Sequence, residues 1–161
     1  MLPLRSNLPV ISEFVFASLA PGFAEKAKAE ADVAILGGEN YGQVSSREPA
    51  SLAPRYLGVH VVLAKSFTCL HWANLINFGV LPLLIRDEYY DKMTEGDYIQ
   101  LRNLHMALTE REKVVVRVKG KHLGCECKLD LSRQERMILL AGGRLNFYRQ
   151  ILSENNHSPR V

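Results

Sequence analysis

The chain has little cysteine and no run of residues apolar enough to cross a bilayer. Its three cysteines, Cys69, Cys125 and Cys127, are odd in number and badly spaced for a disulfide framework or a zinc site. A membrane span needs about 18 consecutive apolar residues, and MLPLRSNLPV at the start lacks the features of a signal peptide. We therefore expect free thiols in a reducing cytoplasm, and no metal or cluster held by this chain.

Charge of one sign is also scarce. The formal net charge is +3, and no block of like charges predicts a nucleic-acid or membrane surface. The densest basic residues alternate with apolar ones, which predicts the solvated face of a hairpin and disfavours a phosphate-binding stripe. These residues are Arg117, Lys119, Lys121 and Lys128.

What is present is the composition of an ordinary globular protein. The hydrophobic fraction of 47% and the charged fraction of 23% allow a sizeable core. A chain of 161 residues is expected to form one domain over residues 1–161. Its last residues, from about 153 to 161, are polar and are expected to be a disordered tail.

Hydrophobic patterns predict an α/β fold. Short apolar runs predict buried strands at 33–36, 59–64 and 82–85. Helical spacing predicts helices at 11–20, 23–31, about 46–56 and 67–79. Strands alternating with helices in this way predict parallel βαβ units.

The second half of the chain has a different pattern. Alternating residues predict strands at 97–101, 113–118 and 124–129, and a Ser132–Glu135 capping box predicts a helix that ends at Gly142-Gly143. We therefore expect a mixed sheet, with a parallel βαβ core flanked by helices and an antiparallel addition.

The stretch VAILGGENYGQVSSREPASLAPRYLGV, residues 33–59, is the candidate ligand site. It places a glycine-rich turn, two serines and an arginine between a buried strand and a helix. Ligands of open α/β sheets bind beyond the carboxyl ends of strands, where helix N-termini favour anions. Gly37, Gly38 and Gly42 permit close backbone approach or positive φ.

The chemistry of the loop favours a carboxylate over a nucleotide. Neither the phosphate-loop pattern nor the dinucleotide fingerprint can be laid on it. Arg47 beside Ser45 and Ser46 suits a carboxylate, which a guanidinium binds through two parallel hydrogen bonds. Ser45 and Glu48 also form a capping-box pattern, however, so spacing alone leaves both a ligand site and a simple helix cap open.

At these residues the sequence resembles the aconitase superfamily. The motifs GGENYGQ-x-SSRE, SLAPRYLGV, AKSF, HxANLINFG and LPL resemble its C-terminal swivelling domain. PLRSNLPVISEFVF (3–16) and LDLSRQERMILLAGGRLNFYR are similar to the bacterial aconitate hydratase type, and the resemblance covers residues 3 to about 149. It implies a substrate domain that moves against a larger part carrying a four-iron, four-sulfur cluster.

The resemblance also implies an activity and its residues. The reaction is the interconversion of citrate and isocitrate through cis-aconitate, a hydro-lyase step in which this chain alone is inactive. By position, Ser45 is the catalytic serine that removes a proton alpha to a carboxylate. Ser46 and Arg47 are substrate-binding residues, and Arg5 binds a further carboxylate, which favours citrate or homocitrate over isopropylmalate.

Some positions depart from the family pattern. Val44 stands where glycine is usual, Pro49 replaces a usual histidine, and Trp72 follows His71 where a basic residue is common. The upstream Thr-Asp-His stretch of the family is missing, so an excised domain, a small subunit and a drifted remnant all remain open. His71 itself is expected to be a structural, hydrogen-bonded histidine.

Two functions therefore follow from the sequence. The first is a swivelling domain, working with a cluster-bearing partner, fused or separate, on a tricarboxylate. The alternative is a diverged, non-catalytic binding module, or the small subunit of a homoaconitase or isopropylmalate dehydratase. A surface made to face a partner is apolar when bare, so we also expect a tendency of the isolated chain to form a homodimer.

Overall fold

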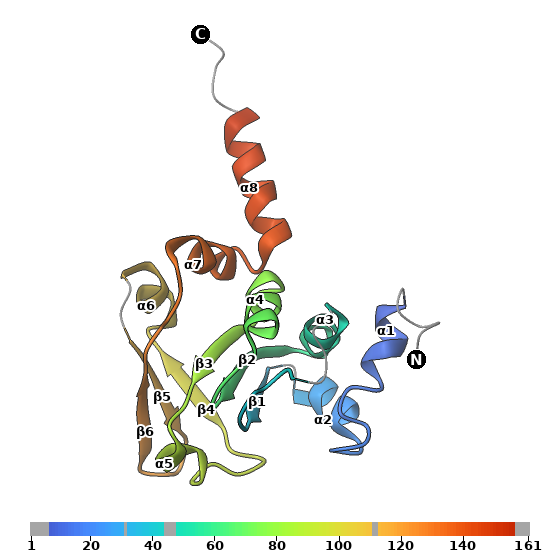
Figure 1. Ribbon diagram of the computed structural model, residues 1–161, viewed down its shortest axis with the longest axis vertical. Helices are drawn as coiled ribbons and strands as arrows, with labels where there is room; N and C mark the ends of the chain where they lie inside the picture. Colours follow the sequence, from blue (N-terminus) through green and yellow to red (C-terminus); the bar gives the residue numbers. More distant parts are fainter. Residues whose placement is uncertain (1–6, 31, 44–47, 111–112, 157–161) are drawn as a thin grey trace.

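The structure, a computed structural model, describes residues 7–30, 32–43, 48–110 and 113–156. Two three-stranded sheets form the body, with helices beside them and one long helix projecting from it (Figure 1). No helix in these residues has the length and apolar character to cross a membrane. The α/β class predicted from the hydrophobic patterns is confirmed.

The first sheet is parallel and contains the three strands predicted from apolar runs. Its order is β1 (Val33–Gly37), β2 (Val59–Ala64) and β3 (Leu81–Leu84). The crossovers contain α3 (Pro49–Tyr56) and α4 (Cys69–Asn77). The central strand β2 is almost entirely buried, which is why its sequence VHVVLA is nearly continuous in apolar residues.

The second sheet is antiparallel and separate from the first. It contains β4 (Ile99–Arg102), β5 (Val114–Val118) and β6 (Leu123–Cys127), in that order. Gly120, with a φ of 80°, lies in the turn between β5 and β6, as expected for a tight hairpin. The basic residues of this hairpin are exposed, which confirms the solvated face; the predicted addition thus forms a sheet of its own and does not extend the parallel one.

One core joins the two sheets. Leu63 of β2 and Leu83 of β3 belong to the same buried cluster as Val116 of β5 and Cys127 of β6. The alternation of buried and exposed residues along β5 gives that strand one core face. In the described part of the chain, the sheets are therefore held to each other by apolar packing and not by backbone hydrogen bonds between strands.

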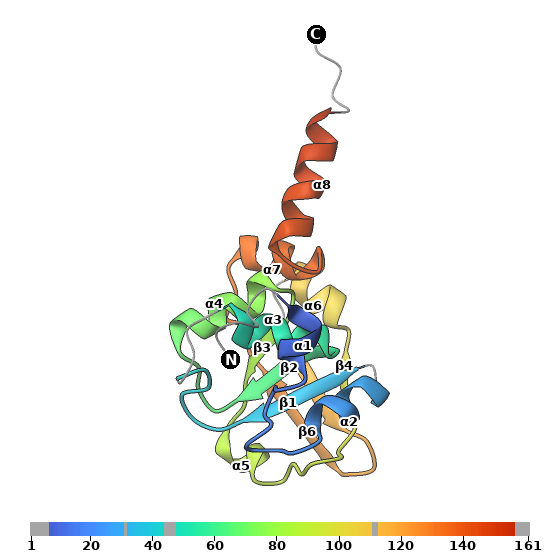
Figure 2. The same ribbon diagram turned by 90° about the vertical axis from the view of Figure 1, so that its right-hand side faces the viewer.

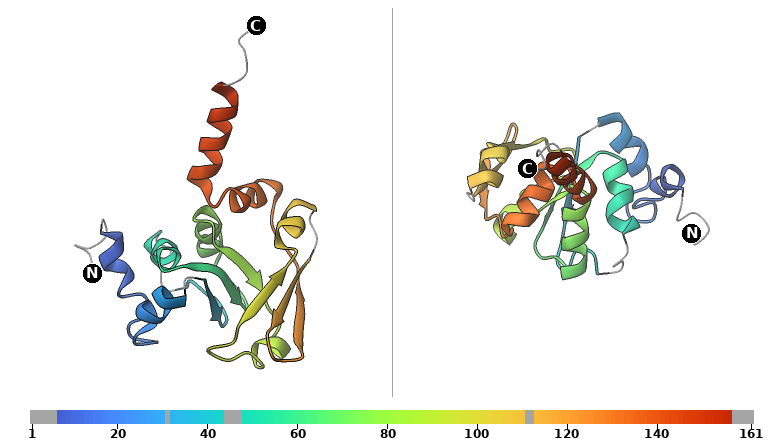
Figure 3. Two further views of the ribbon diagram at one scale, coloured as in Figure 1. Left: turned by 180° about the vertical axis from the view of Figure 1, so that it is seen from behind. Right: turned by 90° about the horizontal axis from the view of Figure 1, so that it is seen from above.

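Helices complete the body. Helices α1 (Leu8–Ser12), α3 and α4 lie in a row, seen from above in Figure 3, and α7 (Arg133–Leu140) contacts α4. The predicted capping box of α7 is present, with the amide of Glu135 donating to Ser132 Oγ at 3.3 Å. The prediction of a helix over 23–31 is met by α2 (Phe23–Glu30).

The prediction of one helix over 11–20 is wrong. Helix α1 ends at Ser12, and the chain then continues in turns, with Phe16 at a φ of 54°. The ring of Phe16 packs edge-on against Phe23 at 5.1 Å between centroids. Aromatic packing on α2 therefore overrides the local helical spacing of these residues.

Three helices were not predicted from the sequence: α5 (Asp87–Tyr90), α6 (Leu104–Glu110) and α8 (Arg144–Asn156). Helix α8 follows the Gly142-Gly143 stop and projects away from both sheets (Figure 2). It continues through residues 153–156, so the predicted disordered tail begins too early; residues 157–161 lie outside the described part of the chain.

Candidate functional site

The carboxyl edge of the parallel sheet brings together the loops that follow β1 and β2. The amide of Asn40 donates to Ser66 Oγ at 2.7 Å, and the amide of Tyr41 donates to the carbonyl of Ser66 at 2.9 Å. The amide of Thr68 returns a bond of 3.1 Å to the carbonyl of Tyr41. These bonds fix the glycine-rich loop, residues 38–43, at the edge where ligands of such sheets bind.

Two of the three glycines in this region meet the predicted requirement. Gly42 has a φ of 91°, and a Cβ added to it would lie 2.3 Å from Cβ and Cγ of His71. A Cβ on Gly37 would lie 2.4 Å from the ring of Tyr41. Gly38 needs neither positive φ nor close approach, because its nearest neighbour would be Tyr90 Oη at 3.9 Å.

Aromatic side chains on α4 and just before it support the glycine-rich loop. His71 is 3% exposed, and its ring lies edge-on to that of Tyr41 at 5.2 Å. Tyr41 also packs against Phe67, which in turn packs against Trp72. Burial lowers the pKa of His71 below its ordinary value and raises the pKa of Tyr41 to about 12, so both side chains are neutral near pH 7.

Lys65 is a cation at this edge that was not predicted from the sequence. It follows β2 directly, and its Nζ lies 3.1 Å from Asp87 Oδ1, 4.0 Å from Asp91 Oδ1 and 4.5 Å from the ring centroid of Tyr90. The hydrogen bond to Asp87 raises the pKa of Lys65. Its position just beyond a buried strand was the available signal.

The predicted catalytic and binding residues lie outside the described residues. The glycine-rich loop ends at Gln43, and the second to fourth residues after it are Ser45, Ser46 and Arg47. Arg5 comes before the start of α1. Within the described part, α3 begins at Pro49, with Glu48 at its N-cap and without a side-chain capping bond. The choice between Ser45 as helix cap and as ligand group therefore stays open.

The described donor groups do not suit a metal or an iron–sulfur cluster. Cys125 and Cys127 share one face of β6, with their sulfurs 3.9 Å apart. Burial raises the pKa of both thiols, that of Cys127 to about 12, which opposes the thiolate form that binds metals. Among the described residues no three candidate ligands gather at one point.

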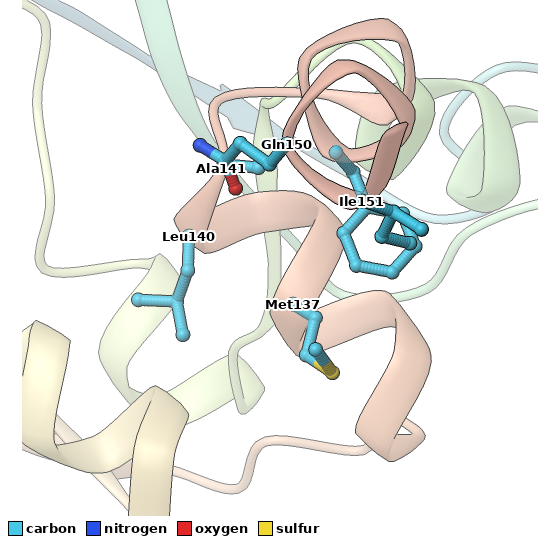
Figure 4. A pocket seen from close by; sticks show the side chains of 6 residues that line it. Met137, Leu140, Ala141, Gln150 and Ile151 are labelled. Carbon is cyan, nitrogen blue, oxygen red and sulfur yellow. The ribbon is translucent and has the colours of Figure 1, made fainter. Parts of the chain in front are cut away.

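A pocket elsewhere on the molecule has the wrong chemistry for a carboxylate. It lies between α7 and α8 (Figure 4) and is lined by Met137, Leu140, Ala141, Phe147, Gln150 and Ile151. Its volume of about 210 Å³ is below the roughly 300–1,000 Å³ of most ligand pockets. Its lining contains no charged side chain, so we do not assign the substrate to it.

Comparison with known proteins identifies relatives of this chain. The family model of the aconitase C-terminal domain matches residues 19–88. The homoaconitase small subunit of the methanogen Methanocaldococcus jannaschii is 34% identical over 148 residues, which is 91% of this chain and 79% of that protein. A 3-isopropylmalate dehydratase small subunit of Archaeoglobus fulgidus is 38% identical over 72% of this chain and 68% of its own.

Longer proteins and solved structures also match. A putative mitochondrial aconitate hydratase of Emericella nidulans is 36% identical over 133 residues, and the chain spans only 17% of its length. The crystal structure of 3-isopropylmalate dehydratase from Methanocaldococcus jannaschii superposes with a TM-score of 0.72 and 27% identity. That superposition covers 93% of this chain and 83% of the other, so nearly the whole fold is shared.

Proposed function

The chain belongs to the aconitase family as its C-terminal, swivelling part, and on this premise we propose that it completes the active site of a hydro-lyase. We propose further that residues 1–161 act as one domain and associate with a larger, cluster-bearing part. Two relatives of similar length are named as small subunits, which supports a separate partner chain.

The substrate that we propose is a tricarboxylate of the homocitrate and homoaconitate type. Relatives of this chain are named for homoaconitase, isopropylmalate dehydratase and aconitate hydratase, so the expectation of citrate in particular has no special support among them. Arg5 favours a substrate with an acidic side arm, because an alkyl arm would leave its guanidinium without a partner. Citrate remains the alternative within the same chemical class.

Each proposed residue has a role that its chemistry allows. Ser45 Oγ, as the alkoxide, takes the proton from the carbon alpha to a carboxylate, and the electrons of that C–H bond form the new double bond. The hydroxyl on the neighbouring carbon leaves as hydroxide and takes up a proton from solvent to become water, and Ser45 returns its own proton to solvent. Arg47 and the N-terminus of α3, which begins four residues after Ser45 in the chain, stabilise negative charge at Ser45. Ser46 and Arg47 bind one carboxylate, and Arg5 binds another.

The four-iron cluster would be held by the partner. When bound, it supplies a Lewis acid for the substrate's hydroxyl and carboxylate. The described residues of this chain offer no ligand set for it, so the chain's own contribution is to bind and orient the substrate and to remove the proton.

One observation carries the proposal: the hydrogen bonds of Asn40 and Tyr41 to Ser66 hold the glycine-rich loop at the carboxyl edge of the sheet. The chain reaches Ser45 two residues after this loop.

Two departures from the family pattern are also accommodated by the fold. Pro49 lies in the first turn of α3, where proline is tolerated, and Trp72 packs on Phe67.

Reconstitution tests the proposal. The chain is mixed with the cluster-bearing part of a homoaconitase or aconitase, and the absorbance of the unsaturated tricarboxylate is followed with homocitrate and with citrate. We expect activity with wild type and none with Ser45→Ala, while both bind the partner equally in size-exclusion chromatography. Equal rates for the two proteins would reject the catalytic role of Ser45.

A further inference from the structure

His71 occupies a place that neither the catalytic roles above nor simple core packing explains. It lies in the first turns of α4, directly beneath the backbone of Gly42, and only 3% of its surface is exposed. Its Nδ1 is buried and has no hydrogen-bond partner among the described residues. The expectation of a hydrogen-bonded structural histidine is therefore wrong for this nitrogen.

An unpaired buried nitrogen is unfavourable unless a partner arrives later. Leaving such a group without a hydrogen bond costs about 1–3 kcal/mol. The ring of Tyr41 lies edge-on to the imidazole, with 5.2 Å between the ring centroids. An apolar side chain of similar size would fill the same space without this cost.

We propose that His71 is a positioning residue for the active-site loop. Its ring supports Gly42 and so fixes the path of residues 38–43, which precede Ser45 in the chain. Its Nδ1 makes a hydrogen bond within the site once substrate and partner are in place. The idea rests on the proposed hydro-lyase function.

The close contact explains why the two positions depend on each other. Gly42 has positive φ and lies so near to His71 that any Cβ on it would overlap the imidazole. A displacement of the ring would therefore move the loop. Misplacing catalytic groups by about 1 Å can reduce a rate about 100-fold even when the altered residue does not touch the substrate.

Variants at His71 separate its ring from its nitrogen. His71→Phe keeps an aromatic ring but has no nitrogen, His71→Asn keeps a polar atom near the position of Nδ1, and His71→Ala removes both. Leu75→Val is the matched control, because Leu75 lies on the same helix and is 2% exposed. All variants are studied in the complex with the cluster-bearing partner and also as isolated chains.

We expect kcat of the complex to fall about 100-fold in His71→Phe, because phenylalanine cannot make the hydrogen bond of Nδ1. In His71→Asn, which can replace that bond, kcat should fall less than about tenfold, although the phenylalanine variant retains the higher melting temperature. Packing alone would not explain a higher kcat in His71→Asn, the less stable of the two variants. Wild-type kcat in His71→Phe would overturn the proposal.

Hydrogen exchange of the isolated chain gives a readout that does not depend on activity. We expect amide exchange of residues 39–43 to become about tenfold faster in His71→Ala and to change little in Leu75→Val. Unchanged exchange in His71→Ala would also overturn the proposal. If every complex, wild type included, were inactive, the proposed function would fail while this measurement still decided the role of the ring.

Discussion

Gly79 and Gly142 lie so close together that a Cβ added to Gly79 would be 2.5 Å from the carbonyl oxygen of Gly142. Gly79 follows the end of α4, and Gly142 follows the end of α7. Both residues have positive φ, 73° and 76°. Two helix ends distant in sequence thus meet backbone to backbone, which only glycine permits.

Gly79→Ala is therefore expected to destabilise the fold by more than about 3 kcal/mol, since it combines positive φ with a backbone clash. Gly120→Ala is the matched control: Gly120 also has positive φ, at 80°, but nothing lies within 4 Å of an added Cβ. The Gly120→Ala variant should lose only about 1–2 kcal/mol of unfolding free energy. Urea unfolding measures both, and equal losses would contradict the close contact.

Arg136 is a buried charge that holds the entry to α7. It is 7% exposed, and its Nε and Nη2 both donate to the carbonyl of Leu131, at 3.1 and 2.9 Å. Arg136→Lys cannot reproduce this fork, so we expect a loss of about 1–3 kcal/mol in thermal unfolding. Arg133→Lys, at an exposed position of the same helix, should stay within about 0.5 kcal/mol of wild type.

The cysteines should differ in reactivity. Cys69 is exposed, whereas Cys125 and Cys127 are buried with raised pKa values. Because the thiolate is the nucleophile, iodoacetamide at about pH 8 should modify Cys69 quickly and leave the other two intact in the folded protein. Mass spectrometry would count the adducts, with full labelling in urea as the control. Rapid labelling of Cys127 in the native state would be inconsistent with this burial.

Alkaline pH should weaken the fold through Cys127. Its pKa is about 12 in the folded protein and 9.0 ordinarily, so the folded state retains its proton more strongly. The stabilisation that comes from this pKa difference is fully present below about pH 9. It is lost as the pH rises toward 12, by up to about 1.4 kcal/mol of unfolding free energy per pH unit. Unfolding of Cys127→Ala should depend less steeply on pH than that of Cys69→Ala; identical slopes would assign the loss to other groups.

Arg5 provides a test of substrate choice. Arg5→Leu should reduce kcat/KM for homocitrate by at least about tenfold in the reconstituted complex, because a charge-assisted hydrogen bond is worth about 1.5–3 kcal/mol. The same change should reduce the rate with isopropylmalate less, or increase it. A uniform loss with both substrates would place Arg5 outside the specificity pocket.

Much of the fold was readable because its signals are local. The apolar runs of the three parallel strands, the capping box at Ser132 and the turn at Gly120 each require only near neighbours in sequence. Phe16 shows the limit of such signals. Its segment has helical spacing, but contact with Phe23 holds it in a turn with positive φ.

The candidate site divides in the same way. The motif around Ser45 and the resemblance that it carries were visible in the sequence, as was the need for glycine at position 42. That Gly42 rests on His71, and that Lys65 is held by Asp87, could not be predicted, because each pair comes from segments separated along the chain.

The sequence by itself determined the family, the parallel order of strands and the residues proposed for chemistry, since periodicity and motifs are properties of neighbouring residues. Only the tertiary structure decided that the antiparallel strands form their own sheet, that α8 leaves the body and that His71 lies beneath the loop. These features depend on which apolar faces meet in space, and that choice is made by the free energy of the whole packed core.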